Sequence, residues 1–89
     1  MKVLVLYRPK SEHGRTIEEY IRDLRSHSRD LKLEVLNIDS RDGSAIASLY
    51  DIVRYPAILV LANDGYLQKS WEGLDDLPLM DEIVAYSYA

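Results

Sequence analysis

Hydrophobic and polar side chains follow patterns along this chain that predict strands and helices in a regular order. The first stretch, Lys2 to Tyr7, is an almost unbroken aliphatic run, typical of a central strand covered on both faces. Apolar side chains then recur at helical spacing from Thr16 onward and predict an amphipathic helix. Thr16 with Glu19 fits a capping box, whereas Ser11 offers an earlier start, so we expect this helix to begin between residues 11 and 16. Its apolar positions are Ile17, Tyr20, Ile21 and Leu24.

Two shorter elements are predicted in the middle of the chain. The stretch Ser26 to Asp30 reads as the loop that ends the first helix. Leu31 to Ile38 alternates between apolar and polar residues at first, as a strand with one less-buried face does. Asp39 to Ser44 reads as a turn, and Ala45 to Tyr50 as a short helix.

The stretch from Tyr50 to Gly73 predicts a β-hairpin around which the rest of the chain is organised. It contains a buried strand at Ala57 to Ala62, an Asn-Asp-Gly turn and a second strand at Tyr66 to Trp71. Pro56 has no backbone N–H to donate, so we expect it at the first residue of the first strand or on a sheet edge.

A last helix is predicted near the end of the chain, where Asp75 and Asp76 offer caps and Pro78 suits a first turn. Its apolar face is formed by Leu79, Met80, Ile83, Val84 and Tyr86. The complete order is β-α-β-α-β-β-α. A right-handed crossover makes the first two strands parallel and adjacent, so the pattern predicts an α/β fold with a four-stranded mixed sheet and helices on both faces.

Composition narrows the range of functions. A chain of 89 residues with 47% apolar residues is enough for one small core, so we expect a single domain over residues 1–89. No apolar run approaches the roughly 18 residues of a membrane span, and no signal-peptide cleavage site is evident; we therefore expect a cytoplasmic protein without a membrane partner. The absence of cysteine excludes disulfides, thiolate metal sites and thiol catalysis. We expect no metal and no cofactor.

Charge is distributed unevenly along the chain, which has a net charge of −4. Residues 1–41 hold nine Lys and Arg against seven Asp and Glu, whereas residues 42–89 hold two against eight. Neither part has the dense basic run of a nucleic-acid binder, and the pI near 5.0 argues the same way. We therefore expect no nucleic-acid partner.

The Tyr50 to Gly73 stretch resembles the thioredoxin superfamily, in which a helix end, a cis-proline, an apolar strand, a tight hairpin and a closing glycine follow one another. The resemblance covers essentially the whole chain, at the size of a glutaredoxin. It implies a thioredoxin-like fold and a cis peptide bond between Tyr55 and Pro56. The chain departs from the family at the active site: Ser11-Glu12-His13-Gly14 stands where the family has Cys-x-x-Cys.

A candidate binding site remains after the loss of cysteine. The start of the first helix keeps unpaired N–H groups, and several basic residues crowd the loop before it, with Arg54 close by if Pro56 faces that loop as in the family. This patch favours anions; the competing interpretation is that its charges are simply solvated. Tyr55 is the aromatic residue expected to be most exposed. The predicted binding residues are Arg8, Lys10, Ser11, His13, Gly14, Arg15, Arg54, Tyr55 and Pro56.

Three functions compete. The leading hypothesis is a redox-inactive thioredoxin-like module whose loop before Pro56 pairs with an extended peptide or binds a small anionic ligand. The second is an enzyme or ligand-binding protein resembling the glutathione-using members, with Ser11 in place of the active-site cysteine and His13 as a conceivable base. Those members usually carry a second helical domain, and we expect none within these 89 residues. The third is a structural subunit of a homo-oligomer, so both a monomer and a homodimer stay open.

Overall fold

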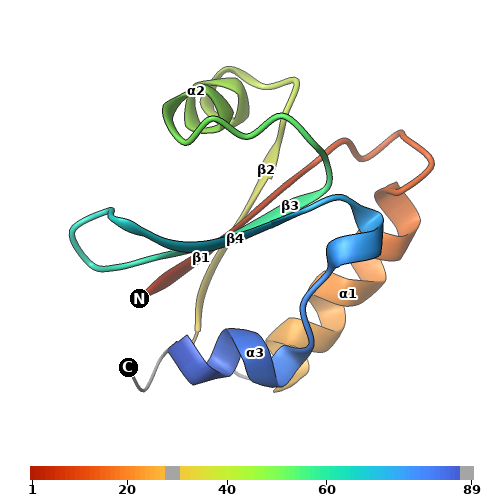
Figure 1. Cartoon of the computed structure of the whole chain (residues 1–89). Coiled ribbons are helices and arrows are strands. Elements are labelled where there is room, and N and C mark those ends of the chain that lie inside the picture. The colour runs from red at the N-terminus through yellow and green to blue at the C-terminus, as the bar shows by residue number, and fades with distance from the viewer. Residues whose placement is uncertain (28–30, 87–89) are drawn as a thin grey trace.

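The structure, a computed structural model, describes residues 1–27 and 31–86. Within these residues, four strands form one mixed sheet in the order β2-β1-β3-β4 (Figure 1). Strands β1 and β2 are parallel, whereas β3 is antiparallel to both β1 and β4. The predicted α/β class and element order are confirmed. The elements are β1 (Lys2–Tyr7), α1 (Gly14–His27), β2 (Lys32–Asn37), α2 (Arg41–Leu49), β3 (Ala57–Leu61), β4 (Leu67–Glu72), the 3₁₀ helix η1 (Leu74–Asp76) and α3 (Met80–Ala85).

Helices cover both faces of the sheet, with α1 and α3 on one face and α2 on the other (Figure 1). Strand β1 lies between two neighbouring strands, and its side chains alternate between the two faces. Val3 and Val5 pack with α1 and α3, while Leu4 and Leu6 pack on the α2 side. The aliphatic run of β1 therefore supplies both cores, as its pattern predicts.

The two cores differ in the helices that close them. On the α1 side, the buried residues from α1 and α3 that meet the sheet are Ile17, Ile21, Leu24 and Ile83. On the α2 side, the shorter helix contributes Ala47, and Ile52 follows it. The amphipathic spacing of the first helix thus directs its apolar face onto the sheet.

Helix α2 begins at Arg41, four residues before its predicted start. Ser40 caps it: its Oγ accepts a hydrogen bond from the Gly43 N–H at 3.0 Å and donates to the Asn37 carbonyl at 2.6 Å. A Cβ on Gly43 would lie 2.0 Å from that same carbonyl oxygen. The predicted turn from Asp39 to Ser44 is therefore wrong after residue 40, because a cap and a close backbone approach let the helix start early.

Helix α1 begins at Gly14, inside the predicted window. Thr16 lies within its first turn, so the Thr16–Glu19 capping box is not formed. The helix continues to His27, and the predicted loop is therefore wrong for residues 26 and 27. The remainder of that predicted loop, residues 28–30, lies outside the described residues.

The last helix is shorter than predicted. Asp75 and Asp76 belong to η1 rather than to a cap, and Pro78 precedes α3 instead of forming its first turn. At the start of α3, the Glu82 carboxylate accepts a hydrogen bond from the Leu79 N–H at 3.3 Å. Across residues 1–27 and 31–86, no helix has the length and apolar character needed to span a membrane.

Candidate functional site

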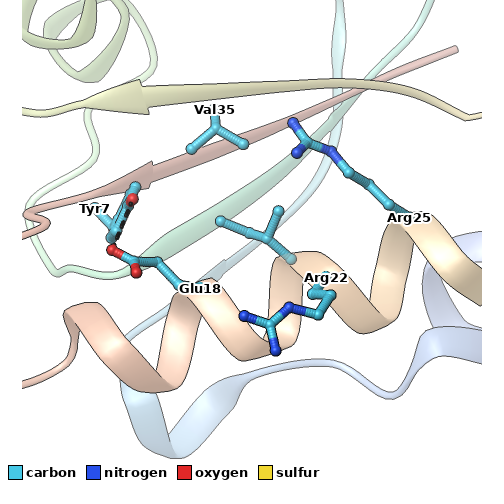
Figure 2. Close-up of a pocket in the computed structure, with 6 residues that line it drawn as sticks. Tyr7, Glu18, Arg22, Arg25 and Val35 are labelled. Atoms are coloured by element: carbon cyan, nitrogen blue, oxygen red, sulfur yellow. Dashed lines mark hydrogen bonds between the residues drawn. The ribbon is translucent and has the colours of Figure 1, made fainter.

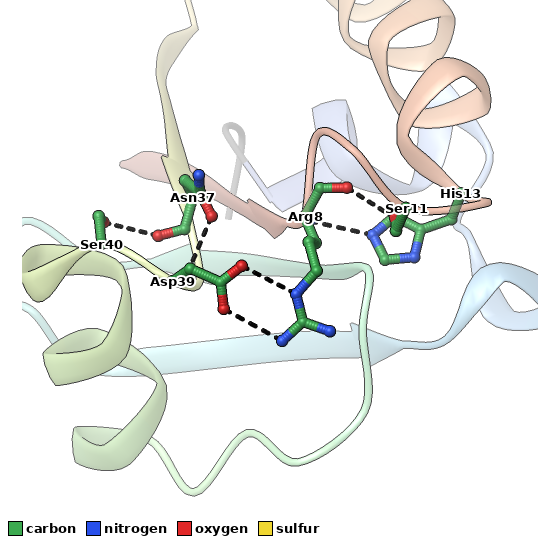
Figure 3. Close-up of polar contacts among 6 residues, drawn as sticks. All are labelled: Arg8, Ser11, His13, Asn37, Asp39 and Ser40. Atoms are coloured by element: carbon green, nitrogen blue, oxygen red, sulfur yellow. Dashed lines mark hydrogen bonds and ion pairs between the residues drawn. The ribbon is translucent and has the colours of Figure 1, made fainter.

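The loop between β1 and α1 lies at the carboxyl end of β1 and is folded tightly on itself (Figure 3). The Arg8 carbonyl accepts two hydrogen bonds from Ser11, one from its N–H at 3.1 Å and one from its hydroxyl at 2.6 Å. The Ser11 carbonyl in turn accepts a hydrogen bond from the Gly14 N–H at 3.2 Å. These bonds connect the end of the strand to the first turn of the helix.

Gly14 is required by a close backbone contact. A Cβ at this position would lie 2.1 Å from the Pro9 carbonyl oxygen and 2.8 Å from its carbon. Real Cβ atoms do not approach backbone atoms so closely, so a side chain here would displace the loop. The predicted site residue Gly14 therefore shapes the loop rather than presenting a functional group.

Arg8 faces β2 rather than the helix start (Figure 3). Its Nε donates to Asp39 Oδ2 at 2.9 Å and its Nη2 donates to Asp39 Oδ1 at 3.2 Å. The Asp39 N–H donates to the side-chain oxygen of Asn37, which positions the carboxylate. This bidentate pair raises the pKa of Arg8, and the Asp39 carboxylate neutralises the guanidinium charge.

His13 is held as a hydrogen-bond acceptor. Its Nε2 accepts the Arg8 N–H at 3.1 Å, which requires that nitrogen to be unprotonated. Burial, and then the nearby Arg8 charge, lower the pKa of His13 below its ordinary value of 6.5. His13 therefore contributes little positive charge at neutral pH.

Most of the other basic residues of the predicted patch form ion pairs with carboxylates. Arg15 lies 3.8 Å from Glu19, and Arg54 lies 3.1 Å from Asp75. Lys10 makes no ion pair within residues 1–27 and 31–86. One uncompensated lysine is a much weaker anion site than the cluster that the sequence predicts.

The arrangement of Ser11 differs from that of an activated nucleophile. Its hydroxyl donates to the Arg8 carbonyl, and no hydrogen bond joins it to His13 in the described part of the chain. Activation of a serine requires a base that accepts its proton. Among the same residues, no group of three His, Cys, Asp or Glu side chains is placed to hold a metal ion.

The second half of the candidate site is the loop that leads into β3. The Tyr55–Pro56 peptide bond is cis, Pro56 is buried, and the Pro56 carbonyl accepts the Gly73 N–H at 2.8 Å. Tyr55 is only half-buried, and its hydroxyl donates to the Ile52 carbonyl at 3.0 Å. The expectation that Tyr55 is the most exposed aromatic residue is therefore wrong. Tyr66, with 70% of its surface exposed, is far more exposed.

Glu72 occupies much of the backbone that was expected to be free before Pro56. Its Oε1 accepts hydrogen bonds from the Val53 N–H at 3.1 Å and from the Arg54 N–H at 3.4 Å. Within the described ranges, the N–H and C=O of Tyr55 have no hydrogen-bond partner. Tyr55 also lies near enough to contribute, weakly and after Asp39, to the raised pKa of Arg8, so the two loops adjoin.

A shallow hollow of about 320 Å³ lies beside these loops, at the carboxyl ends of the parallel strands β1 and β2. It is lined by Arg8, Pro9, Lys10, Asn37 and Asp39. The carboxyl ends of parallel strands commonly position ligand sites in α/β folds. In this chain the Arg8–Asp39 ion pair lies at that position, so the positive and negative charges there balance each other.

Sequence reasoning did not identify the acidic residues that bind the basic patch or the loop before Pro56. Asp39 follows β2, Glu72 ends β4 and Asp75 lies within η1. Each binds a group from a distant part of the chain. The only signal for Asp39 is its place directly after the strand parallel to β1, where neighbouring strand ends meet. Nothing in the local sequence pairs the other two with the loop before Pro56.

Comparison with known proteins connects this geometry to one fold. No protein-family model matches the chain, and no curated protein matches it in sequence. Among solved structures, thioredoxin 1 of Thermosipho africanus TCF52B superposes with a TM-score of 0.71 at 12% identity, over 99% of this chain and 92% of that one. The oxidised thioredoxin of Plasmodium falciparum superposes with a TM-score of 0.75 at 15% identity, over 94% and 78%.

Thioredoxin O2 of Arabidopsis thaliana, in its oxidised state, gives a TM-score of 0.69 at 14% identity, over 98% of this chain and 71% of that one. Identities this low carry information on the backbone arrangement and not on activity. The chain therefore has a thioredoxin-like fold, with Ser11 to Gly14 at the start of α1 and no cysteine anywhere in its sequence.

Proposed function

We propose that this chain is a redox-inactive thioredoxin-like module that binds an extended peptide along the loop before Pro56. The observation that carries the proposal is the backbone of Tyr55, whose N–H and C=O have no partner among the described residues while Glu72 occupies the two preceding amides. An extended segment satisfies such groups by forming main-chain hydrogen bonds with them.

Exposed apolar side chains lie near Arg54, the residue before Tyr55. Val53 is 80% exposed and Leu74 is 44% exposed. Both lie next to Arg54: Val53 precedes it in the chain, and the residues on either side of Leu74 approach the Arg54 side chain. Apolar side chains beside free main-chain groups favour a peptide with apolar residues over a small polar ligand.

An anionic ligand is the second candidate, supported by a different observation. The N–H groups of Arg15 and Thr16 in the first turn of α1 have no acceptor among the described residues, and Lys10 in the preceding loop makes no ion pair there. Because the other basic side chains are paired, we expect weak affinity that falls with added salt.

A nuclear magnetic resonance titration tests both candidates. The probes are inorganic phosphate, glutathione and a neutral extended peptide, Ac-Ala-Val-Thr-Val-Ala-NH₂, each at about 1 mM, a concentration that detects weak binding. The peptide should shift the amides of Val53 to Tyr55, whereas an anion should shift those of Ser11 to Thr16. If the peptide leaves the Tyr55 amide unmoved, the proposed peptide site is wrong.

Val53→Asp and Leu79→Asp form a matched pair for this test, because both side chains are exposed, 80% and 72% respectively. Val53→Asp places a charge beside the proposed peptide and should weaken its binding about tenfold, equivalent to about 1.4 kcal/mol. Leu79 lies at the start of α3, so Leu79→Asp should leave binding unchanged.

Insulin reduction by dithiothreitol should also proceed at the uncatalysed rate in the presence of the protein, because no thiol is available to cycle between its oxidised and reduced forms.

A further inference from the structure

Strand β2 forms an open edge of the sheet. It has β1 on one side and no strand on the other within the described residues. Its six residues pair with β1 without a break in register, from Lys2 with Lys32 to Tyr7 with Asn37, and the strand contains neither proline nor glycine. The opposite edge differs, because the pairing of β4 with β3 has a register shift between Val60 and Leu61.

Proteins usually protect such an edge with bulges, prolines or charged side chains. Strand β2 carries charged side chains on the α2 face only, at Lys32 and Glu34. On the other face, Leu33 and Val35 are partly buried against the core that α1 closes. The edge therefore presents regular backbone and an apolar surface to a neighbour.

A groove lies along this edge, between β2 and α1 (Figure 2). It has a volume of about 350 Å³ and an apolar floor that includes Ile21 and Val35. Arg22 and Arg25 rise from α1 at the groove, one helical turn apart. Figure 2 shows the Arg25 side chain extending toward β2.

Neither of these two arginines forms an ion pair with a carboxylate in the described part of the chain. Arg8, Arg15 and Arg54 each lie within ion-pair distance of a carboxylate, whereas Arg22 and Arg25 have no such partner there. Glu18, the one acidic residue among the described residues that line the groove, accepts a hydrogen bond from the Tyr7 hydroxyl at 3.4 Å. Guanidinium groups bind carboxylates through two parallel hydrogen bonds, so the groove suits an acidic side chain.

We propose that β2 receives an additional strand from a partner protein, in a segment that alternates acidic and apolar residues. The acidic side chains face α1 and bind Arg22 and Arg25, while the partner backbone pairs with the free edge of β2. This surface is separate from the loop before Pro56 and adds a second contact to the proposed function.

The opposite face of the edge accommodates the alternate side chains of that segment. A second groove of about 290 Å³ lies between the sheet and α2. It is lined by the apolar residues Leu4, Leu36, Ala45, Ile46 and Leu61 and by the charged residues Lys2, Glu34 and Asp42. Because side chains of a strand alternate between faces, every second residue of the added strand reaches this groove. Leu36 and Ile46 give apolar residues at those positions a contact surface beside charged side chains, whereas the acidic positions are set by Arg22 and Arg25 on the α1 face.

A second copy of this chain matches the edge less well. Residues that lie opposite each other in paired strands share a face, so β2 of a second copy would present Leu33 and Val35 to the α1 side. Neither is acidic, and the strand would leave Arg22 and Arg25 without carboxylates. The charge pattern thus favours a partner strand of different sequence.

The test uses the peptide Ac-Thr-Val-Glu-Val-Glu-Val-Thr-NH₂ and a control peptide with lysine in place of both glutamates. Addition of the acidic peptide should shift the backbone amides of residues 32–37 and protect some of them from hydrogen exchange. The lysine peptide should bind at least about fivefold more weakly, as expected from loss of exposed charge pairs. Absence of any shift in β2 at about 1 mM acidic peptide overturns the proposal.

Charge reversal on the protein side provides the matched control. Arg22→Glu and Arg25→Glu should each weaken binding of the acidic peptide about fivefold and improve binding of the lysine peptide. Arg41→Glu changes an exposed arginine at the start of α2, away from the α1 groove, and should leave both affinities unchanged. Equal effects of all three substitutions would indicate general charge attraction and overturn the assigned site.

Backbone pairing has its own test. Two forms of the acidic peptide, N-methylated at alternate residues in either phase, each block one edge of the peptide strand, so at least one form should lose binding. Undiminished binding of both forms contradicts strand addition. Protection, in the protein alone, of the β2 amides that point away from β1, together with a dimer by sedimentation, would assign the edge to a second copy instead. Shifts near Tyr55 report the proposed function separately.

Discussion

Replacement of Gly14 by alanine tests how the loop before α1 is held. The added Cβ would lie 2.1 Å from the Pro9 carbonyl oxygen, and neither atom belongs to a side chain that can rotate away. Overpacking of this kind costs about 1–3 kcal/mol. Alanine is favoured over glycine in a helix by up to about 1 kcal/mol, and that gain is small at the first helical position. We therefore expect a net loss of about 1–2 kcal/mol in the free energy of unfolding.

Urea unfolding followed by circular dichroism measures this loss. A domain of this size has a denaturant slope of about 1 kcal/mol per molar urea, so the midpoint should fall by roughly 1–2 M. Ser44→Ala, an exposed substitution inside α2, should change the midpoint little. The Arg8 amide resonance should also move in Gly14→Ala, because that N–H donates to His13 across the same loop. An unchanged or higher midpoint would refute the steric role of Gly14.

Two further predictions concern the core and pH. Leu24→Ala removes a fully buried side chain of α1 and should lower the free energy of unfolding by about 2–5 kcal/mol, whereas Leu79→Ala, at an exposed position, should stay within about 0.5 kcal/mol of wild type; similar losses in both would contradict the assigned core. His13 has a folded pKa below 6.5, so the unfolded chain binds more protons in mild acid. Its stabilising contribution is present above pH 6.5 and is lost as the pH falls from there toward the folded pKa. Unfolding midpoints at about pH 7.5 and 5 should differ more in wild type than in His13→Gln, and a His13 resonance titrating at or above 6.5 would exclude the mechanism.

The candidate site was only partly predictable from sequence. The loop after β1 was identified because a helix start follows a strand end there, and Gly14 was included in it. The charge state of that loop was not predictable: Arg8 binds Asp39, and Arg54 binds Asp75, each pair far apart in the chain. Counting basic residues in one segment overlooks carboxylates that the fold brings to it.

Element boundaries show a similar division. The early start of α2 depends on Ser40, whose side chain bonds Asn37 and Gly43, and on the glycine that permits the contact with the Asn37 carbonyl. Ser40 is a good cap by type, but residues 39–44 also read as a turn, because serine, aspartate and glycine favour both structures. Only the packed position of α2 decides between them.

The sequence alone determined the order of the elements, the buried faces and the absence of thiol chemistry. Apolar spacing is a local property: a period of two places Val3 and Val5 on one face of β1, and helical spacing places Ile17 and Leu24 together on α1. Tertiary structure alone decided which charges are free and which edge is open. Arg8 and Arg25 look alike in sequence, yet one is bound by a carboxylate and the other lies at a groove beside β2, because ion pairs depend on distances that only the folded chain defines.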